Sequence, residues 1–330
     1  MGEFRIFIVV FFVTRSTLMT EQSDPAKLAQ NSRIDEVWEV IADFNLGVPR
    51  ADLENLDFKD LMQVRINKIL LVSSLYDFYT LVEDGQLTEA IFNEFLELNL
   101  HYAANIRRVN TGKAALEALA HEDFDLIIST QRLEDMSISA FAQAVRISHP
   151  EVPVALLAYH SREFEILHDT GETSGFDGVF VWHGDTKLFL AIIKLFEDKR
   201  NAPHDCLELS VRTIILVEDS PAFYSSYLPL IYAELIQQVQ ELIKEGKSFS
   251  DKLLRQRARP KILHATTFEQ AMEYYEQYRS TLLGIITDME YEKDGKIDEH
   301  AGLRLIEEVR KEDPELPILI QSATARPEDV

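Results

Sequence analysis

Short apolar segments alternate with amphipathic helices along most of this chain, and this alternation constrains the fold more than any other feature. The segments are rich in leucine and β-branched residues, and polar residues or turn signals bound them. Strands that are buried on both faces and separated by helices are typical of a parallel sheet built from βα units. The first series of strands is expected at residues 68–72, 106–109, 125–129, 152–158 and 178–181, with helices at 112–120, 139–148 and 187–199.

The same order of elements restarts in the second half of the chain. Strands are expected at residues 213–217, 261–265, 282–287 and 316–321, and helices at 222–244, 268–278 and 301–311. The sequence therefore predicts an α/β protein with two flavodoxin-like, doubly wound parallel sheets in tandem. The second series is expected to lack its last strand and helix.

An N-terminal extension precedes both series. Residues 34–44 and 51–66 carry apolar side chains at helical spacing, which predicts a helical lead-in that docks on the first domain. The predicted domains are an extension at 1–66, a first α/β domain at 67–200 and a second at 211–330, with a linker at 201–205.

An apolar run at residues 4–13 is too short to cross a bilayer, which takes about 20 residues. The small-residue cleavage pattern of a signal peptide does not follow it. Three interpretations stay open: an over-extended start ahead of Met19, a buried or edge strand, and a membrane anchor.

The chain is strongly acidic, with a formal net charge of −23 and a pI of about 4.8. Such a chain repels nucleic-acid phosphates and anionic membrane surfaces, so neither nucleic acid nor a membrane is expected as a partner. The best basic stretch is short and is expected to be solvated: Arg255, Arg257, Arg259 and Lys261. Because Cys206 is the only cysteine, no internal disulfide forms, and we expect a cytoplasmic protein.

Acidic side chains follow two strands of the second series at the point where each strand ends. Glu218 and Asp219 end the first strand, and Asp288 ends the third. These strands are neighbours in the flavodoxin-like order 2-1-3-4-5, and ligand chemistry gathers at the carboxyl ends of such strands. Three converging carboxylates repel one another unless a divalent cation lies among them. Oxygen-only ligands favour Mg²⁺ or Mn²⁺.

A hydroxyl, that of Ser322, follows the fourth strand at the same edge and is expected to donate to a phosphoryl oxygen on Asp288. The predicted chemistry is nucleophilic attack by the Asp288 carboxylate on a phosphohistidine or a small phosphodonor, with the cation offsetting charge on the transferred group. The alternative is that these acids only cap helix N-termini.

These residues resemble the response-regulator receiver family over residues 211–330. The acidic pair Glu218 and Asp219, an acceptor in segment 284–288 and a hydroxyl in segment 317–323 carry the resemblance. It implies a phosphorelay protein rather than a turnover enzyme, with Asp288 phosphorylated by a histidine kinase or phosphotransfer protein. It also implies that the backbone carbonyl of Glu290 helps to bind the metal.

The sequence departs from the family pattern at two places. The family usually has a lysine after its fifth strand, and neither appears before Val330, so either the sequence is truncated or another segment completes the site. The stretch between Asp219 and Lys261 is also unusually long. It predicts a first helix that extends beyond its domain as a surface for a partner or for self-association.

When the receiver pattern is compared with the first series of strands, neutral residues occupy all of its key positions. Ser73 and Ser74 replace the acidic pair, and Thr130 replaces the acceptor. Ala158 replaces the hydroxyl residue, and Trp182 replaces the lysine and is expected to be buried. The first domain is therefore predicted to be a degenerate receiver that serves protein interaction.

Other functions stay open. The tandem arrangement also resembles the N-terminal regulatory region of phosphoenolpyruvate-synthase-like and kinase-like fusion proteins, through segments 69–79 and 254–263. That resemblance implies a regulatory fragment with a C-terminal enzyme domain and no phosphorylation of its own. A metal-dependent phosphatase with Asp288 as nucleophile and an inert scaffold are the remaining alternatives. The acidic segment 290–298 is expected to be a solvated loop rather than a calcium loop.

Overall fold

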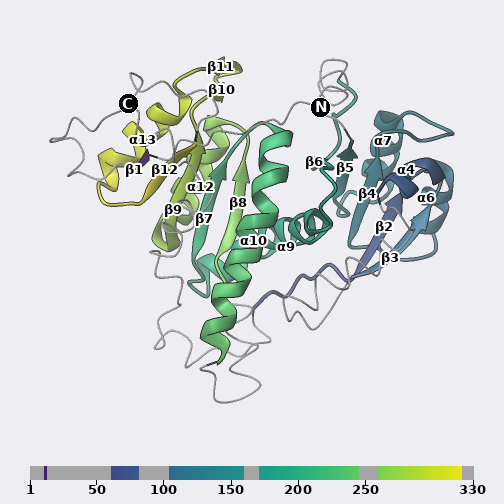
Figure 1. The fold of residues 1–330 in the computed structure, drawn as a ribbon, viewed down its shortest axis with the longest axis horizontal. Helices are drawn as coiled ribbons and strands as arrows, with labels where there is room; N and C mark the ends of the chain where they lie inside the picture. The colour runs from purple at the N-terminus through teal and green to yellow at the C-terminus, as the bar shows by residue number, and fades with distance from the viewer. Residues whose placement is uncertain (1–10, 13–60, 82–103, 160–170, 245–258, 322–330) are drawn as a thin grey trace. The chain divides into compact units, whose positions relative to one another are not determined.

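The computed structural model describes residues 11–12, 61–81, 104–159, 171–244 and 259–321 (Figure 1). These residues form two compact units. The first unit comprises residues 64–197 and 220–233, and the second comprises the other described residues. No helix in these ranges combines the length and the apolar character needed to cross a bilayer.

A five-stranded parallel sheet forms the centre of the first unit. Its strands in spatial order are β3 (Asn105–Val109), β2 (Lys68–Val72), β4 (Leu126–Thr130), β5 (Val154–Ala158) and β6 (Gly178–Val181). Every residue of β4 and β5 is buried, as expected for central strands covered by helices on both faces. The predicted order 2-1-3-4-5 is confirmed in this sheet.

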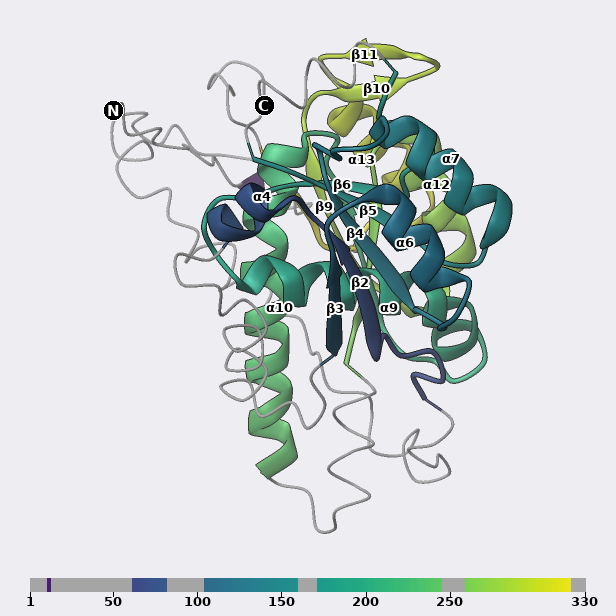
Figure 2. The same ribbon diagram turned by 90° about the vertical axis from the view of Figure 1, so that its right-hand side faces the viewer.

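Helices connect and cover these strands: α4 (Leu75–Leu81), α6 (Gly112–Leu119), α7 (Ile138–Ser148) and α9 (Lys187–Leu207). Helices α6 and α7 lie on one side of the sheet and α4 on the other (Figure 2). Helix α6 begins where the Thr111 hydroxyl accepts from the amide of Ala114. Helix α7 begins at Ser137 in the same way. The apolar faces of α6 and α7 pack against β2, β4 and β5 in one core.

The edge strand β6 is covered by residues 220–233, which include the first part of α10 (Pro221–Lys244) and belong to the first unit. The amide of Val181 donates to the Ser225 hydroxyl at 2.9 Å. The rings of Phe180 and Tyr224 lie edge to face, with centroids 5.7 Å apart. Covering an edge strand removes a template for pairing with other chains.

The second unit contains a parallel sheet with the same strand order over four strands. These are β8 (Lys261–Ala265), β7 (Thr213–Val217), β9 (Leu282–Asp288) and β12 (Ile318–Gln321). On the outer edge of β12, where a fifth parallel strand is usual in this fold, lies β1 (Phe11–Phe12), which runs antiparallel. Of the interpretations of the apolar run, an edge strand is therefore what the structure shows at Phe11 and Phe12.

One face of this second sheet is covered by α12 (Phe268–Tyr278) and α13 (Ala301–Glu312), with a 3-10 turn at η1 (Arg279–Thr281) after α12 (Figure 1). The core also contains Ala202 and Cys206 from the second half of α9. Flavodoxin-like α/β folding of both halves is thus confirmed.

The predicted linker at 201–205 is wrong, because α9 continues through it to Leu207. Buried ion pairs fix this part of the helix in the second unit. The Lys261 ammonium lies 3.0 Å from the Asp205 carboxylate, and both side chains are fully buried. Arg259 donates to Asp198 from both terminal guanidinium nitrogens, at 2.7 and 2.9 Å. Two residues of the predicted solvated basic stretch are therefore buried instead; Arg255 and Arg257 lie outside the described residues.

The predicted helix at 51–66 is also wrong at its end, since residues 61–66 are not helical. Met62 has a left-handed backbone (φ 50°), and its amide donates to the Asp205 carboxylate. The amide of Ile66 donates to Glu197 at 3.1 Å. Carboxylates from α9 thus replace the helical hydrogen bonds of this segment. Residues 34–44 and 51–60 lie outside the described residues.

The acidic segment after Asp288 is a short hairpin rather than a loop. Its strands are β10 (Tyr291–Lys293) and β11 (Lys296–Asp298). Both turn residues, Asp294 and Gly295, have positive φ, of 54° and 74°. This is the backbone of a two-residue hairpin turn, for which Asp-Gly is a preferred sequence.

Candidate functional site

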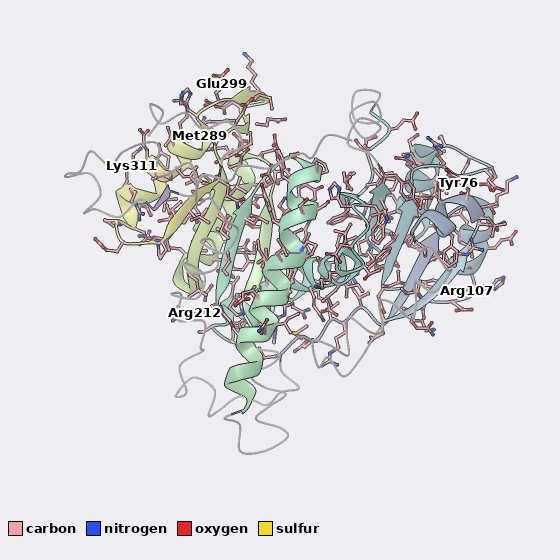
Figure 3. All side chains as sticks on the ribbon, viewed as in Figure 1. Tyr76, Arg107, Arg212, Met289, Glu299 and Lys311 are labelled. Atoms are coloured by element: carbon pink, nitrogen blue, oxygen red, sulfur yellow. The ribbon has the colours of Figure 1, made fainter. Side chains whose placement is uncertain are left out.

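The candidate site lies at the carboxyl ends of β7 and β9 in the second unit. Arg212, just before β7, and Met289, just after β9, mark the two ends of this sheet in Figure 3. The paired strands β7 and β9 align Val217 with Thr287. The acids that follow these two residues therefore emerge side by side at the end of the sheet marked by Met289.

Three carboxylates meet there, from Glu218, Asp219 and Asp288. One oxygen of each lies within 4.8 Å of one oxygen of the others. Glu218 is only 2% exposed, whereas Asp219 and Asp288 are partly buried and open to solvent on one side. The structure thus brings together the three acids that the sequence predicts.

The charge of Asp288 is poorly compensated by its surroundings. The pKa of its carboxyl group is raised to about 6, mainly by burial and also by the negative charges of Asp219 and Glu290. Hydrogen bonds from the backbone amides of Met289 and Glu290 act in the opposite direction. A raised pKa beside two other acids is the expected property of a site built for a cation or for chemistry at the carboxylate.

The donor set fits a hard divalent cation. All the converging groups are carboxylates, and such oxygen ligands are those that Mg²⁺ and Mn²⁺ prefer. The partial exposure of Asp219 and Asp288 leaves room for water or substrate oxygens as further ligands.

A glycine, Gly302, allows α13 to lie close to the end of β9. The amide of Gly302 donates to the carbonyl of Met289 at 3.0 Å. A side chain at this position would place its Cβ 2.2 Å from the carbonyl oxygen of Asp288. Only glycine therefore allows the first turn of α13 to pack against the backbone of the candidate acceptor.

The other two predicted site residues are placed less fully. Glu290 is exposed, and its backbone amide donates a hydrogen bond to the Asp288 carboxylate. Ser322 lies outside the described residues; Gln321, which precedes it, is buried and pairs with Asp288 across β12 and β9.

Sequence reasoning missed His264 and Tyr291. The ring of His264 donates from Nε2 to the backbone carbonyl of Glu218 at 2.8 Å. The Tyr291 hydroxyl lies 3.1 Å from that of Thr287, the residue before Asp288. For His264, the signal available in the sequence was a lone histidine within the apolar strand 261–265.

The matching edge of the first sheet has a different chemistry. The strand register places Thr130 as Asp288 is placed in the second unit, because Val72 aligns with Ser129 as Val217 does with Thr287. The Thr130 hydroxyl donates at 3.0 Å to the carboxylate of Asp77, which is 3% exposed and which the sequence did not single out.

Trp182 is buried, as predicted, and its ring lies edge to face with that of Phe189, with centroids 5.7 Å apart. Tyr159, near the same edge, donates from its hydroxyl to the backbone carbonyl of Asp77 at 3.0 Å. In the described part of the first unit, no group of three acids, histidines or cysteines matches the cluster at Asp288.

Comparison with known proteins finds sequence relatives for part of the chain. The regulatory protein LuxO of Vibrio vulnificus is 34% identical over 80 residues, and the luminescence regulatory protein LuxO of Vibrio campbellii is 35% identical over 80 residues. Each match covers 24% of this chain and 17% of the relative, so it spans about a sixth of the relatives' length. No family model matches the chain.

Solved structures of receiver domains are similar to part of the chain. The signal receiver domain of a putative LuxO repressor protein from Vibrio parahaemolyticus matches over 44% of this chain and 98% of its own, with 18% identity and a TM-score of 0.33. The chemotaxis response regulator CheY4 of Vibrio cholerae matches over 40% of this chain and 98% of its own, with 16% identity and a TM-score of 0.30.

The strand order described above carries the assignment of a flavodoxin-like fold, and the sequence matches are to regulatory proteins. The tandem arrangement of two receivers and the resemblance to phosphoenolpyruvate-synthase-like proteins stay predictions.

Proposed function

We propose that this protein is a phosphorelay signalling protein in which Asp288 accepts a phosphoryl group. The observation that supports this most is the convergence of Glu218, Asp219 and Asp288 within 4.8 Å at the carboxyl ends of adjacent parallel strands. On this proposal residues 211–330 form the phosphoacceptor domain. Residues 67–200 form a domain for protein interaction, since neutral side chains stand where the acidic pair and the acceptor would be.

The chain's own part in the reaction is to hold and expose a nucleophile. A carboxylate oxygen of Asp288 forms the new P–O bond, the P–N bond of the donor phosphohistidine breaks, and the leaving imidazole takes up a proton from water. Glu218, Asp219 and Asp288 would hold Mg²⁺ or Mn²⁺, with the backbone carbonyl of Glu290 as a further ligand. When bound, the cation offsets negative charge on the transferred group.

The partners follow from this chemistry. A histidine kinase or a phosphotransfer protein is the expected phosphodonor, in the cytoplasm, and Ser322 is the expected contact to the phosphoryl group on Asp288. The sequence relatives are described as regulatory proteins, which agrees with a role in signalling.

Incubation with acetyl phosphate and Mg²⁺, followed by intact-mass measurement, tests the proposal. We expect one added phosphoryl group, sensitive to hydroxylamine as an acyl phosphate is, and absent without a divalent cation. Asp288→Asn is expected to abolish the addition. Thr130→Val, at the equivalent position of the first sheet, is the matched control and is expected to leave it unchanged.

The outcomes separate the alternatives. Absence of labelling in the wild-type protein contradicts the proposal and favours an inert scaffold. Continuous release of phosphate from small phosphate esters favours a metal-dependent phosphatase with Asp288 as nucleophile.

A further inference from the structure

His264 connects the edge strand of the second sheet to the acidic pair. It lies in β8, opposite Leu216 of β7 in the strand register. Its Nε2 donates to the backbone carbonyl of Glu218 at 2.8 Å. A carbonyl oxygen only accepts, so the ring carries its proton on Nε2 in this contact.

The carbonyl that His264 binds belongs to the peptide bond between Glu218 and Asp219. The amide on the other side of Glu218 donates to the carbonyl of Ala265 at 3.0 Å. Strand β7 ends at Val217, so these two hydrogen bonds continue the attachment to β8 beyond the ladder of the sheet. The backbone that carries both acids is thus held from β8 on each side of Glu218.

The contribution of the ring to this contact is a directed N–H donor.

We propose that His264 is a positioning residue for the divalent-cation site. By holding the peptide between Glu218 and Asp219, it fixes the directions in which these two carboxylates meet Asp288. The inference rests on the proposed function, because it assigns a role within the cation site proposed there. A group that fixes metal ligands from outside their own shell commonly changes metal affinity about 10–100-fold when it is removed.

Calorimetric titration of the protein with MgCl₂ tests this role, with three variants. His264→Leu removes the donor and is expected to raise the dissociation constant for Mg²⁺ about 10–100-fold. His264→Gln keeps an N–H donor and is expected to stay within a few-fold of the wild type. Leu263→Ala, in the same strand and in the core, is expected to lower stability without changing the dissociation constant.

Phosphorylation by acetyl phosphate provides a second readout. The labelling rate of His264→Leu is expected to fall at low Mg²⁺ and to recover at saturating Mg²⁺, which a loss of folding does not produce. Equal Mg²⁺ affinity in His264→Leu and the wild type overturns the inference and leaves the proposed function standing. Equal losses of affinity in all three variants overturn it in favour of general destabilisation. A wild-type protein that binds no Mg²⁺ and takes up no phosphoryl group instead contradicts the proposed function itself.

Discussion

The hydroxyl of Thr130 donates a hydrogen bond to the carboxylate of Asp77 across 3.0 Å, at the place in the first sheet that Asp288 takes in the second. Asp77 lies in α4 and is almost fully buried. A buried carboxylate is costly unless it is hydrogen-bonded. The first unit therefore uses the position that matches Asp288 to satisfy one of its own side chains.

Removal of this hydroxyl is expected to destabilise the first unit. Thr130→Val keeps the shape of the side chain but deprives Asp77 of a donor, and we expect the free energy of unfolding to fall by about 1–3 kcal/mol. Urea unfolding, followed by the fluorescence of Trp182 in a Trp38→Phe background, measures the change. Thr130→Ser keeps the hydroxyl and is the control; similar stability of the valine variant and the wild type contradicts the role of the bond.

An acid at position 130 is not expected to create a second phosphoacceptor. In Thr130→Asp a carboxylate replaces the donor that Asp77 requires, and two like charges at that distance repel each other. We expect a loss of stability and, in the acetyl phosphate experiment, still one phosphoryl group per chain. Detection of two groups shows that the first unit needs only an acceptor to react.

The raised pKa of Asp288 predicts a pH dependence of stability. Its folded-state value of about 6 lies above the reference value of 3.8, so folding favours the protonated form. The stabilisation is complete below pH 4 and is lost as the pH rises through 6, at most about 3 kcal/mol for this shift.

Urea unfolding of the metal-free protein between pH 4 and 7.5 measures this dependence. We expect the free energy of unfolding of the wild type to fall with rising pH relative to that of Asp288→Asn, and added Mg²⁺ to reduce the difference. Parallel profiles of the two proteins show that Asp288 titrates with an ordinary pKa.

The strands could be predicted because they are buried on both faces, so that burial leaves a continuous apolar run in the sequence. The segment 213–217 is such a run, and every residue of β7 is buried. The helical conformation of residues 201–205 could not be predicted in this way. Pro203 indicates a break, but the ion pair between Asp205 and Lys261 holds the helix through it, and these two residues are far apart in the sequence.

The residues of the site differ in the same way: some leave a local signal in the sequence, and others depend on contacts with distant residues. Glu218, Asp219 and Asp288 could be found because each lies at the carboxyl end of a strand, and these strand ends meet at one edge of a sheet. His264 and Asp77 act through hydrogen bonds to other elements, and their neighbours in the sequence carry no sign of these partners. The hairpin turn at Asp294 and Gly295 did carry a local signal, an Asp-Gly pair, which the surrounding acidic residues obscured.

The close approach of Gly302 to Asp288 predicts that Gly302→Ala damages the site. The added Cβ meets a backbone oxygen at 2.2 Å, so α13 or the acceptor loop has to move. We expect lower stability and a loss of labelling by acetyl phosphate.

Gly112→Ala in the first unit is the matched control, since it is also a glycine in the first turn of a helix. Its Cβ meets the side chain of Met136 at 2.6 Å, which is flexible and can move away. We expect labelling to be unchanged in this variant. Normal labelling of Gly302→Ala shows that the acceptor tolerates movement of α13.

The buried pair of Lys261 and Asp205 predicts a large and non-additive effect on the stability of the second unit. Lys261→Met leaves the Asp205 carboxylate fully buried without its cation, and we expect a loss of about 3–5 kcal/mol. The double variant Lys261→Met/Asp205→Leu removes both charges and is expected to be more stable than Lys261→Met, although the amide of Met62 then loses its acceptor.

A double-mutant cycle by urea unfolding measures the coupling between the two side chains. Lys311→Met is the control, because Lys311 pairs with Glu308 at 2.7 Å on the exposed surface, where such a pair contributes about 0–1 kcal/mol. Since Asp205 also accepts from Met62, the cycle reports how firmly the second half of α9 and the segment at Met62 are held within the second unit. If the effects of the two single substitutions on the free energy of unfolding add up to that of the double variant, this attachment depends instead on apolar packing around Cys206.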